Sequence, residues 1–473
     1  MAKPKLYRLL EQLDGKELPW FDKFIGSPYF NSNELTGKLW GILREAFPDF
    51  EKLGREQVFA ALCPGQPFDA PFLNARYSEL SQLVEEFFVQ QELRREGALS
   101  YPARRAACRS RKMPRQHERE CRRQAGELEA GGWDIRNAGP LLDIYDELYF
   151  GRMRSARQEE GNEALQKAMS CLDRHFLLFK LKYLADLWAR QQMFNEAPAV
   201  LFQEAALAEA AGRQEQDPLI RLYCRLASLL RGGFSEESFR ALWRLFREDG
   251  RRLPQAEKSF FIAKFVTLAF QRLNKGEMAY QALLVEMYKY ADEGQLLVED
   301  GQITDSSFSN VCAVGIAAKE FDWVLGFMAR HKKFLPPPDA EQAYALGKTA
   351  VLLGQEDYKG AHLLLQGIRD RRPNFQLRLH SLSVRCLLGM CLEDTTCYSA
   401  LCHGAEAFSR YIRRQPSLSP GRRKGYLNFV RAVKKIAALR LHGWASARAR
   451  NGLRQWVGSL DPLMLRPWLE QLL

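Results

Sequence analysis

The chain has 473 residues, of which 46% are hydrophobic and 27% charged, and its formal net charge is +12. This hydrophobic content is ordinary for a chain that buries a core, which excludes extended disorder over most of its length. The most apolar run, SFFIAKFVTLAF, contains Lys264 and is far shorter than the ~20 residues that span a bilayer, so we expect no membrane partner. The opening segment carries acidic side chains where a secretory signal is apolar, and the 10 cysteines include no CxxC pair. We therefore expect a cytoplasmic protein with reduced thiols.

The stretch FIGSPYFN near the start of the chain predicts a break between two helices. The preceding segment, LPWFDKFI, reads as a short helix that ends at Gly26, because glycine accepts the left-handed backbone of many helix caps. Pro28 disfavours helical backbone in the residue before it, and an asparagine or serine shortly afterwards can cap the next helix. We expect Tyr29 and Phe30 to be buried where the two helices meet.

The apolar pattern divides the chain into three regions. Apolar residues recur at steps of three and four over residues 71–89, and this and similar patterns predict a bundle of about five helices over residues 1–95. Residues 96–135 are basic and weakly periodic, so we expect a basic helical linker with solvated side chains. In residues 136–473 helical segments alternate with short Gly, Pro and Asp signals, which predicts a degenerate helical-repeat solenoid with basic C-terminal helices and an apolar cap.

One repeat unit is nearly explicit in the second half of the chain. Tyr358, Ala361, Leu365 and Ile368, followed by Pro373, match the second helix of a tetratricopeptide repeat, in which the small residue lets neighbouring helices approach. We expect antiparallel helix pairs over residues 304–318, 320–333, 340–354, 357–370, 375–392, 397–414 and 419–441. The predicted fold class is therefore all-α, with an N-terminal helical domain followed by a tetratricopeptide-like α-solenoid.

Several stretches together resemble a family of uncharacterised helical-repeat proteins of Bacteroidota that have an N-terminal domain of the SPYFN type. The resembling stretches run from Phe21 to Val430, and they include FDKFIGSPYFN, LDRHFLLFKLKY, GQITDSSFSNVCAVGIAAKEFDWV and SLSPGRRKGYLNFV. Within them, the blocks SPYFN and KEFDWV are the most specific. The resemblance implies a tetratricopeptide-like fold and a cytoplasmic setting. It implies no activity, so no site residue is transferred from the family.

Positive charge is concentrated towards the C-terminal end of the chain. No acidic residue lies between Glu406 and Asp461, whereas the same interval is rich in arginine and lysine. Such a surface suits a phosphate backbone or an acidic protein, and a solvated arginine-rich helix surface is the plainer alternative. The candidate partner-binding residues are Arg410, Arg413, Arg414, Arg422, Arg423, Lys424, Arg431, Lys434 and Lys435.

Motifs for catalysis or cofactor binding are weak. Residues 347–349 spell GKT, but Gln342 stands where a phosphate-binding loop has glycine, and the context is helical. Two groups of cysteine and histidine residues have spacings unlike those of ordinary zinc sites, so packed small side chains are the favoured interpretation and zinc the alternative. The groups are Cys108, His117 and Cys121, and Cys386, Cys391, Cys397, Cys402 and His403. We expect no enzyme, no catalytic residue, no cofactor and no metal.

The N-terminal region offers one nucleic-acid motif. A short helix, a turn and a long helix resemble the helix-turn-helix part of winged-helix regulators. Its base-reading candidates are Asn74, Arg76, Ser78 and Gln82, but Glu79 shares the helix and no wing hairpin follows. A plain helical bundle is the favoured interpretation.

The function predicted from the sequence is a non-enzymatic protein–protein interaction scaffold, because stacked helical repeats leave a long surface suited to a peptide or protein partner. The identity of the partner is unknown, and the basic C-terminal helices favour an acidic one. The alternative is a nucleic-acid-binding regulator that uses the helix-turn-helix-like segment or the same basic helices.

Overall fold

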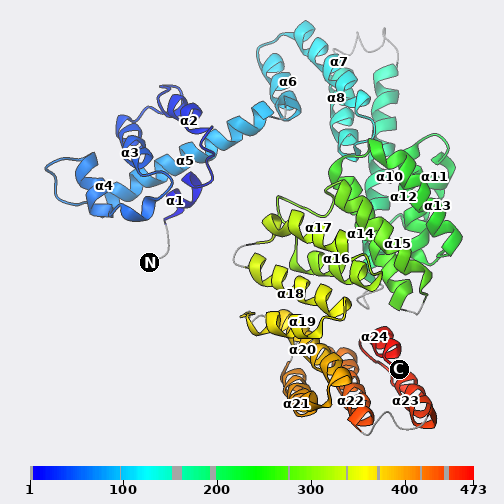
Figure 1. Cartoon of the computed structure of the whole chain (residues 1–473). Coiled ribbons are helices and arrows are strands. Elements are labelled where there is room, and N and C mark those ends of the chain that lie inside the picture. The colour runs from blue at the N-terminus through cyan, green and yellow to red at the C-terminus, as the bar shows by residue number, and fades with distance from the viewer. Residues whose placement is uncertain are drawn as a thin grey trace. The chain divides into compact units, whose positions relative to one another are not determined.

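The computed structural model describes residues 4–95, 97–151, 162–191, 199–274, 277–336, 339–369, 373–415, 418–441 and 447–473. The described residues are 80% helical and contain no β-strand, so the predicted all-α class is confirmed (Figure 1). None of the described helices combines the length and the apolar composition that crossing a membrane requires. By its internal contacts the chain divides into two compact units, Met1–Phe179 and Lys180–Leu473.

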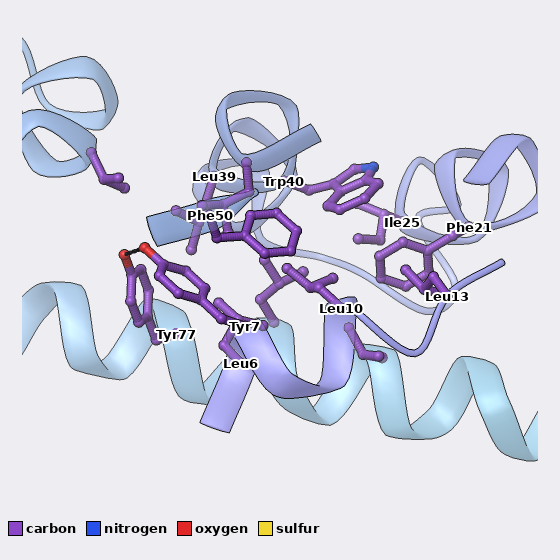
Figure 2. Close-up of a cluster of buried hydrophobic side chains, with 14 of the residues drawn as sticks. Leu6, Tyr7, Leu10, Leu13, Phe21, Ile25, Leu39, Trp40, Phe50 and Tyr77 are labelled. Atoms are coloured by element: carbon purple, nitrogen blue, oxygen red, sulfur yellow. Dashed lines mark hydrogen bonds between the residues drawn. The ribbon is translucent and has the colours of Figure 1, made fainter. Parts of the chain in front are cut away.

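The first unit begins with five α-helices around one aromatic-rich core. These are α1 (Lys5–Leu10), α2 (Leu18–Ile25), α3 (Glu34–Glu45), α4 (Arg55–Leu62) and α5 (Ala70–Arg95). The long helix α5 packs against α1, α2 and α3, and Leu80, Val84 and Phe87 on its inner face are buried. Figure 2 shows Tyr7 of α1 meeting Tyr77 of α5, with their hydroxyl oxygens 2.9 Å apart. The predicted apolar stripe of α5 is thus one wall of this core.

The break after α2 occurs where the sequence predicts it, but with a different geometry. Gly26 caps α2 in a right-handed conformation, with φ of −73°, so its left-handed freedom is not used. Phe30 is partly buried and stacks on Phe24, with ring centroids 4.2 Å apart. The expectation that Tyr29 is buried is wrong, because 89% of this residue is exposed. Phe30 takes the inward position of the turn, and its neighbour Tyr29 is left in solvent.

The next three helices form a small layer of their own. They are α6 (Tyr101–Ser110), α7 (Pro114–Ala130) and α8 (Ala138–Phe150). Helix α7 packs against both α6 and α8, and the long helix α10 (Glu163–Gln191) adds Ala168 to their core. Arg105 of α6 is only 3% exposed and pairs with Glu147 of α8. The expectation that the basic side chains of this segment are solvated is therefore wrong for Arg105.

The second unit begins with five α-helices that pack mainly on their neighbours in sequence. They are α11 (Gln203–Arg213), α12 (Pro218–Arg231), α13 (Glu236–Asp249), α14 (Gln255–Asn274) and α15 (Ala279–Glu293). Asp217 and Ser235 cap α12 and α13 by accepting hydrogen bonds from first-turn backbone amides. Between the helices, Phe246 contacts Phe261 and Phe265 ring to ring in the core.

The following helices lie where the sequence predicts them, with every end within four residues of its expected position. They are α16 (Asp305–Ala317), α17 (Phe321–His331), α18 (Asp339–Gly354), α19 (Tyr358–Gln366), α20 (Pro373–Glu393), α21 (Tyr398–Arg414) and α22 (Pro420–Leu441). Each of these helices contacts the next one in sequence. Helices α17 and α18 also both contact the short 3-10 turn between them. In addition, α16 contacts α18, α18 contacts α20, and α20 contacts α22.

The repeat residues pack α19 closely onto α20. Ala361 is fully buried, and Leu365 and Ile368 are nearly so. Gly389 of α20 faces the ring of Tyr358, since a Cβ at position 389 would lie 2.2 Å from a ring carbon. The small residues Ala361 and Gly389 therefore permit α19 and α20 to approach each other closely.

The last two helices, α23 (Ala447–Ser459) and α24 (Arg466–Gln471), pack against the core shared by α20, α21 and α22. Leu453, Val457 and Leu469 are buried in that core. The backbone amide of Met464 also donates to the carbonyl of Gly425, at 3.2 Å. These contacts hold the apolar C-terminal segment on α22.

Candidate functional site

The nine candidate partner-binding residues lie on two helices that pack against each other, α21 and α22. An ion pair joins the helices, with Nζ of Lys434 3.0 Å from Oε1 of Glu406. The hydrogen bond from Lys434 holds the pKa of Glu406 below its usual value. Lys434, one of the nine candidates, is therefore already paired within the α21–α22 helix pair.

Two further candidates are also engaged with the protein. Arg423 is half-buried and donates to the backbone carbonyl of Gln415 at 2.9 Å. The ammonium of Lys435 lies 4.1 Å from the ring centroid of Trp456, although the side chain stays exposed on its other side. Arg423 and Lys435 add positive charge to the surface, but each already interacts with another group of the protein.

The remaining six candidates form what we call the basic face: Arg410, Arg413, Arg414, Arg422, Lys424 and Arg431. All six are exposed, and within the described part of the chain none of them forms an ion pair. Lys424 and Arg431 are seven residues apart on α22, which places them on the same side of the helix. The structure thus places six exposed cations on one helix pair, and Arg410 among them lies near enough to Glu406 to help lower its pKa.

Two of the four helix-turn-helix candidates of α5, Arg76 and Asn74, are engaged within the N-terminal bundle. Arg76 pairs with Glu79 at 2.5 Å, and the other oxygen of Glu79 accepts from Asn33 and Thr36, each at 2.8 Å. Asn74 accepts a hydrogen bond from a neighbouring arginine of α4. Arg76 and Asn74 are therefore engaged in contacts within the bundle, whereas Ser78 and Gln82 are exposed on α5, the central packed helix of the bundle.

A pocket of about 590 Å³ opens between α15, α17 and the 3-10 turn η5 (Lys332–Phe334). Asp292, which is 8% exposed, is its buried acid. The carboxylate accepts from His331 Nε2 at 2.8 Å, from Arg330 at 2.5 Å and from Trp323 Nε1 at 3.3 Å. Burial would raise the pKa of Asp292, but the hydrogen bonds from His331 and Arg330 outweigh it, so the pKa is lowered. The helix expected over 320–333 contains His331, but its partner Asp292 lies 39 residues earlier in the chain, where no local pattern marks it.

The structure brings together part of one cysteine–histidine group. His117 and Cys121 are adjacent on α7, and Glu147 of α8 joins them within ligand distance, whereas Cys108 does not belong to this set. Glu147 was missed because it lies 30 residues from His117 in the sequence. Among the described residues, the second group shows no comparable cluster. Its Cys386 and Cys391 are fully buried, as packed small side chains are.

The GKT triplet lies inside α18 and not in a loop. The hydroxyl of Thr349 donates to the carbonyl of Ala345 at 2.9 Å, as helical threonines often do. Gly347 faces the side chain of Met328 across a close contact between helices. Neither backbone amides nor hydroxyl are available to a phosphate at this position.

Comparison with protein-family models, curated proteins and solved structures gives no match for this chain. The resemblance to a Bacteroidota helical-repeat family accordingly stays a prediction.

Proposed function

We propose that the chain is a non-enzymatic cytoplasmic scaffold whose basic face binds an acidic segment of a protein partner. The observation that carries this proposal is the positive charge of α21 and α22. Six exposed cations there lack an ion pair among the described residues. Charges of this kind steer association and fix orientation more than they add affinity, so binding should be strongly salt-sensitive.

The same proposal assigns helices α16 to α22 to a degenerate tetratricopeptide-like solenoid. Support comes from the contacts between alternate helices, α16 with α18, α18 with α20 and α20 with α22, in addition to those between neighbours. The buried Ala361 and the Tyr358 ring against Gly389 supply the close approach that such stacking uses. A stacked array of this kind leaves one long surface free for an extended partner.

The limited exposure of the aromatic side chains of α21 and α22 favours a protein partner over nucleic acid. The phenylalanines of α21 and α22 are buried and their tyrosines, Tyr398, Tyr411 and Tyr426, are only partly exposed, which limits the surface on which an unpaired base could stack. The alternative, a regulator that binds nucleic acid, would rely mainly on phosphate contacts of the basic face, since Arg76 and Asn74 are already engaged and only Ser78 and Gln82 of the base-reading candidates are left exposed.

The proposal is tested by charge reversal on α22. We expect the double variant Lys424→Glu/Arg431→Glu to bind a fluorescent polyglutamate peptide roughly tenfold more weakly, because exposed charge pairs contribute about 0.2–1 kcal/mol each. Fluorescence anisotropy at low and physiological salt measures this. The matched control is Arg225→Glu/Arg244→Glu, which makes the same change of charge at exposed positions of α12 and α13.

Equal weakening by both double variants would contradict a specific role for the basic face. A duplex DNA oligonucleotide provides the second arm of the experiment. If DNA binds more tightly than the peptide, with log affinity falling by about 0.9 per contacted phosphate for each log unit of salt, the nucleic-acid alternative replaces the scaffold.

A further inference from the structure

Helices α7 and α8 bring a histidine, a cysteine and a glutamate into one interior cluster. His117 and Cys121 are one turn apart on α7, so their side chains leave the same face of the helix. Glu147 comes from α8, and one ligand atom from each of the three side chains lies within 4.8 Å of the other two. Cys121 is fully buried and His117 is 9% exposed, so the cluster is shielded from solvent.

The distances in the cluster are close to those of a tetrahedral zinc site. Sγ of Cys121 is 3.7 Å from Nε2 of His117, and the same nitrogen is 2.8 Å from Oε2 of Glu147. Nitrogen and sulfur ligands at the usual bond lengths to zinc are about 3.5 Å apart. The sulfur and nitrogen are therefore already placed, while the hydrogen bond between Nε2 of His117 and Oε2 of Glu147 must break for an ion to bind that nitrogen.

Among the residues that the structure describes, none hydrogen-bonds to one of the two carboxylate oxygens of Glu147. Its Oε2 accepts from His117, from Nε of Arg105 at 3.2 Å and from Arg109 at 3.0 Å. Its Oε1 accepts no hydrogen bond from the residues that the structure describes. The two arginines hold the carboxylate by one oxygen, as outer partners of ligating carboxylates do, and leave the other oxygen for an ion.

We propose that Nε2 of His117, Sγ of Cys121 and Oε1 of Glu147 bind one zinc ion, with water as the fourth ligand. A nitrogen, a thiolate and a carboxylate form a donor set that suits zinc, whereas magnesium and calcium prefer oxygen alone. On binding, the Cys121 thiol releases its proton to solvent and the sulfur bonds to zinc. Nε2 of His117, which donates to Glu147 in the structure, gives up its proton to solvent, and the neutral ring takes up one proton on Nδ1. The ion would link α7 to α8 and stabilise the packing of the two helices.

The two arginines beside Glu147 are compatible with an ion. Arg109 is half exposed, so its guanidinium can turn towards solvent. Arg105 has a second partner, because its Nη1 donates to Oε1 of Gln124 at 2.6 Å. The thiolate and the carboxylate together balance the charge of zinc. The competing explanation is an arginine–glutamate network without metal, and such a network gives Cys121 no role beyond packing.

The test uses the full chain, stripped of metal with a chelator, dialysed, and then titrated with zinc chloride or cobalt chloride. We expect one zinc per chain by elemental mass spectrometry after a second dialysis, and a rise in the thermal midpoint with zinc. With cobalt we expect an intense thiolate-to-cobalt charge-transfer band and the visible bands of a tetrahedral ion. Absence of both bound zinc and the thiolate band in the wild-type chain would overturn the proposal.

Variants locate the ion. Cys121→Ser and His117→Gln should each lose the zinc and the charge-transfer band, with folding checked by circular dichroism. Cys171→Ser is the matched control, since Cys171 packs beside the same core but is not in the ligand set. Zinc retained at wild-type level by Cys121→Ser would also overturn the proposal.

Discussion

Asp292 shows how a single buried carboxylate organises its surroundings. It lies in the last turn of α15, while its donors His331, Arg330 and Trp323 all come from α17. Leaving a charge unpaired in such a place is costly, so three donors on one carboxylate indicate a contact that joins the two helices.

We expect Asp292→Asn to lower the free energy of unfolding by about 3 kcal/mol at neutral pH, because it breaks a buried charge pair. The hydrogen bonds lower the pKa of Asp292 below the value of about 3.9 for an unfolded chain. The stabilisation is therefore present above about pH 4 and is lost as the pH falls through the folded pKa.

Urea denaturation of the wild type and the variant at neutral pH and at about pH 3 measures the difference. The cost of the substitution should shrink in acid. Glu293→Gln is the control, since Glu293 is exposed beside Asp292. An Asp292→Asn cost that is equal at both pH values would show that the ionised carboxylate is not what stabilises the pocket.

At the scale of the helix, the contact between α19 and α20 depends on a missing side chain. Gly389 lies in the interior of α20, where alanine would ordinarily be preferred by about 1 kcal/mol. Here the ring of Tyr358 occupies the space that a Cβ would need, at 2.2 Å. Since both groups belong to packed helices, neither can move away without disturbing the core that contains Leu365 and Cys386.

We expect Gly389→Ala to lower the free energy of unfolding by about 1–3 kcal/mol, because overpacking outweighs the gain in helix propensity. The matched control is Gly452→Ala in α23, where no atom lies within 4 Å of the new methyl group. That substitution should stabilise the chain by up to about 1 kcal/mol. Chemical denaturation measures the change in the free energy of unfolding for both variants. A stabilising effect of Gly389→Ala would show that α19 and α20 are not closely packed.

At the scale of the whole molecule, the chain has separate hydrophobic cores. The clusters around Phe21 and Ile144 belong to the unit Met1–Phe179, and those around Phe408 and Leu365 to the unit Lys180–Leu473. No single core spans the described residues, so cooperativity is expected within each unit more than across the chain.

We therefore expect thermal unfolding to depart from a two-state transition. The calorimetric enthalpy should exceed the van't Hoff enthalpy, because two or more cooperative units absorb heat separately. Differential scanning calorimetry of the full chain measures both quantities. Equal enthalpies would mean that the units unfold as one, and would contradict the division at Phe179.

The sequence predicts those parts of the structure that local patterns determine. The helix expected over 340–354 is observed at Asp339–Gly354, because apolar spacing and flanking proline and glycine signals act within a few residues. Burial of Arg105 and the pairing of Glu147 with His117 escape such patterns, since the partners are 42 and 30 residues apart. The basic face was found because an absence of acidic residues is visible in the sequence itself.

The contact between Tyr7 and Tyr77 also determines when the N-terminal core can form during synthesis. Tyr7 leaves the ribosome 70 residues before Tyr77 does, and α1 has only 6 residues, too few to be stable alone. Leu6 and Leu10, which α5 helps to bury, are therefore exposed on the nascent chain until α5 has emerged. The N-terminal core forms late and as a whole, and the growing chain is the stage at which this unit is most open to aggregation and most in need of a chaperone.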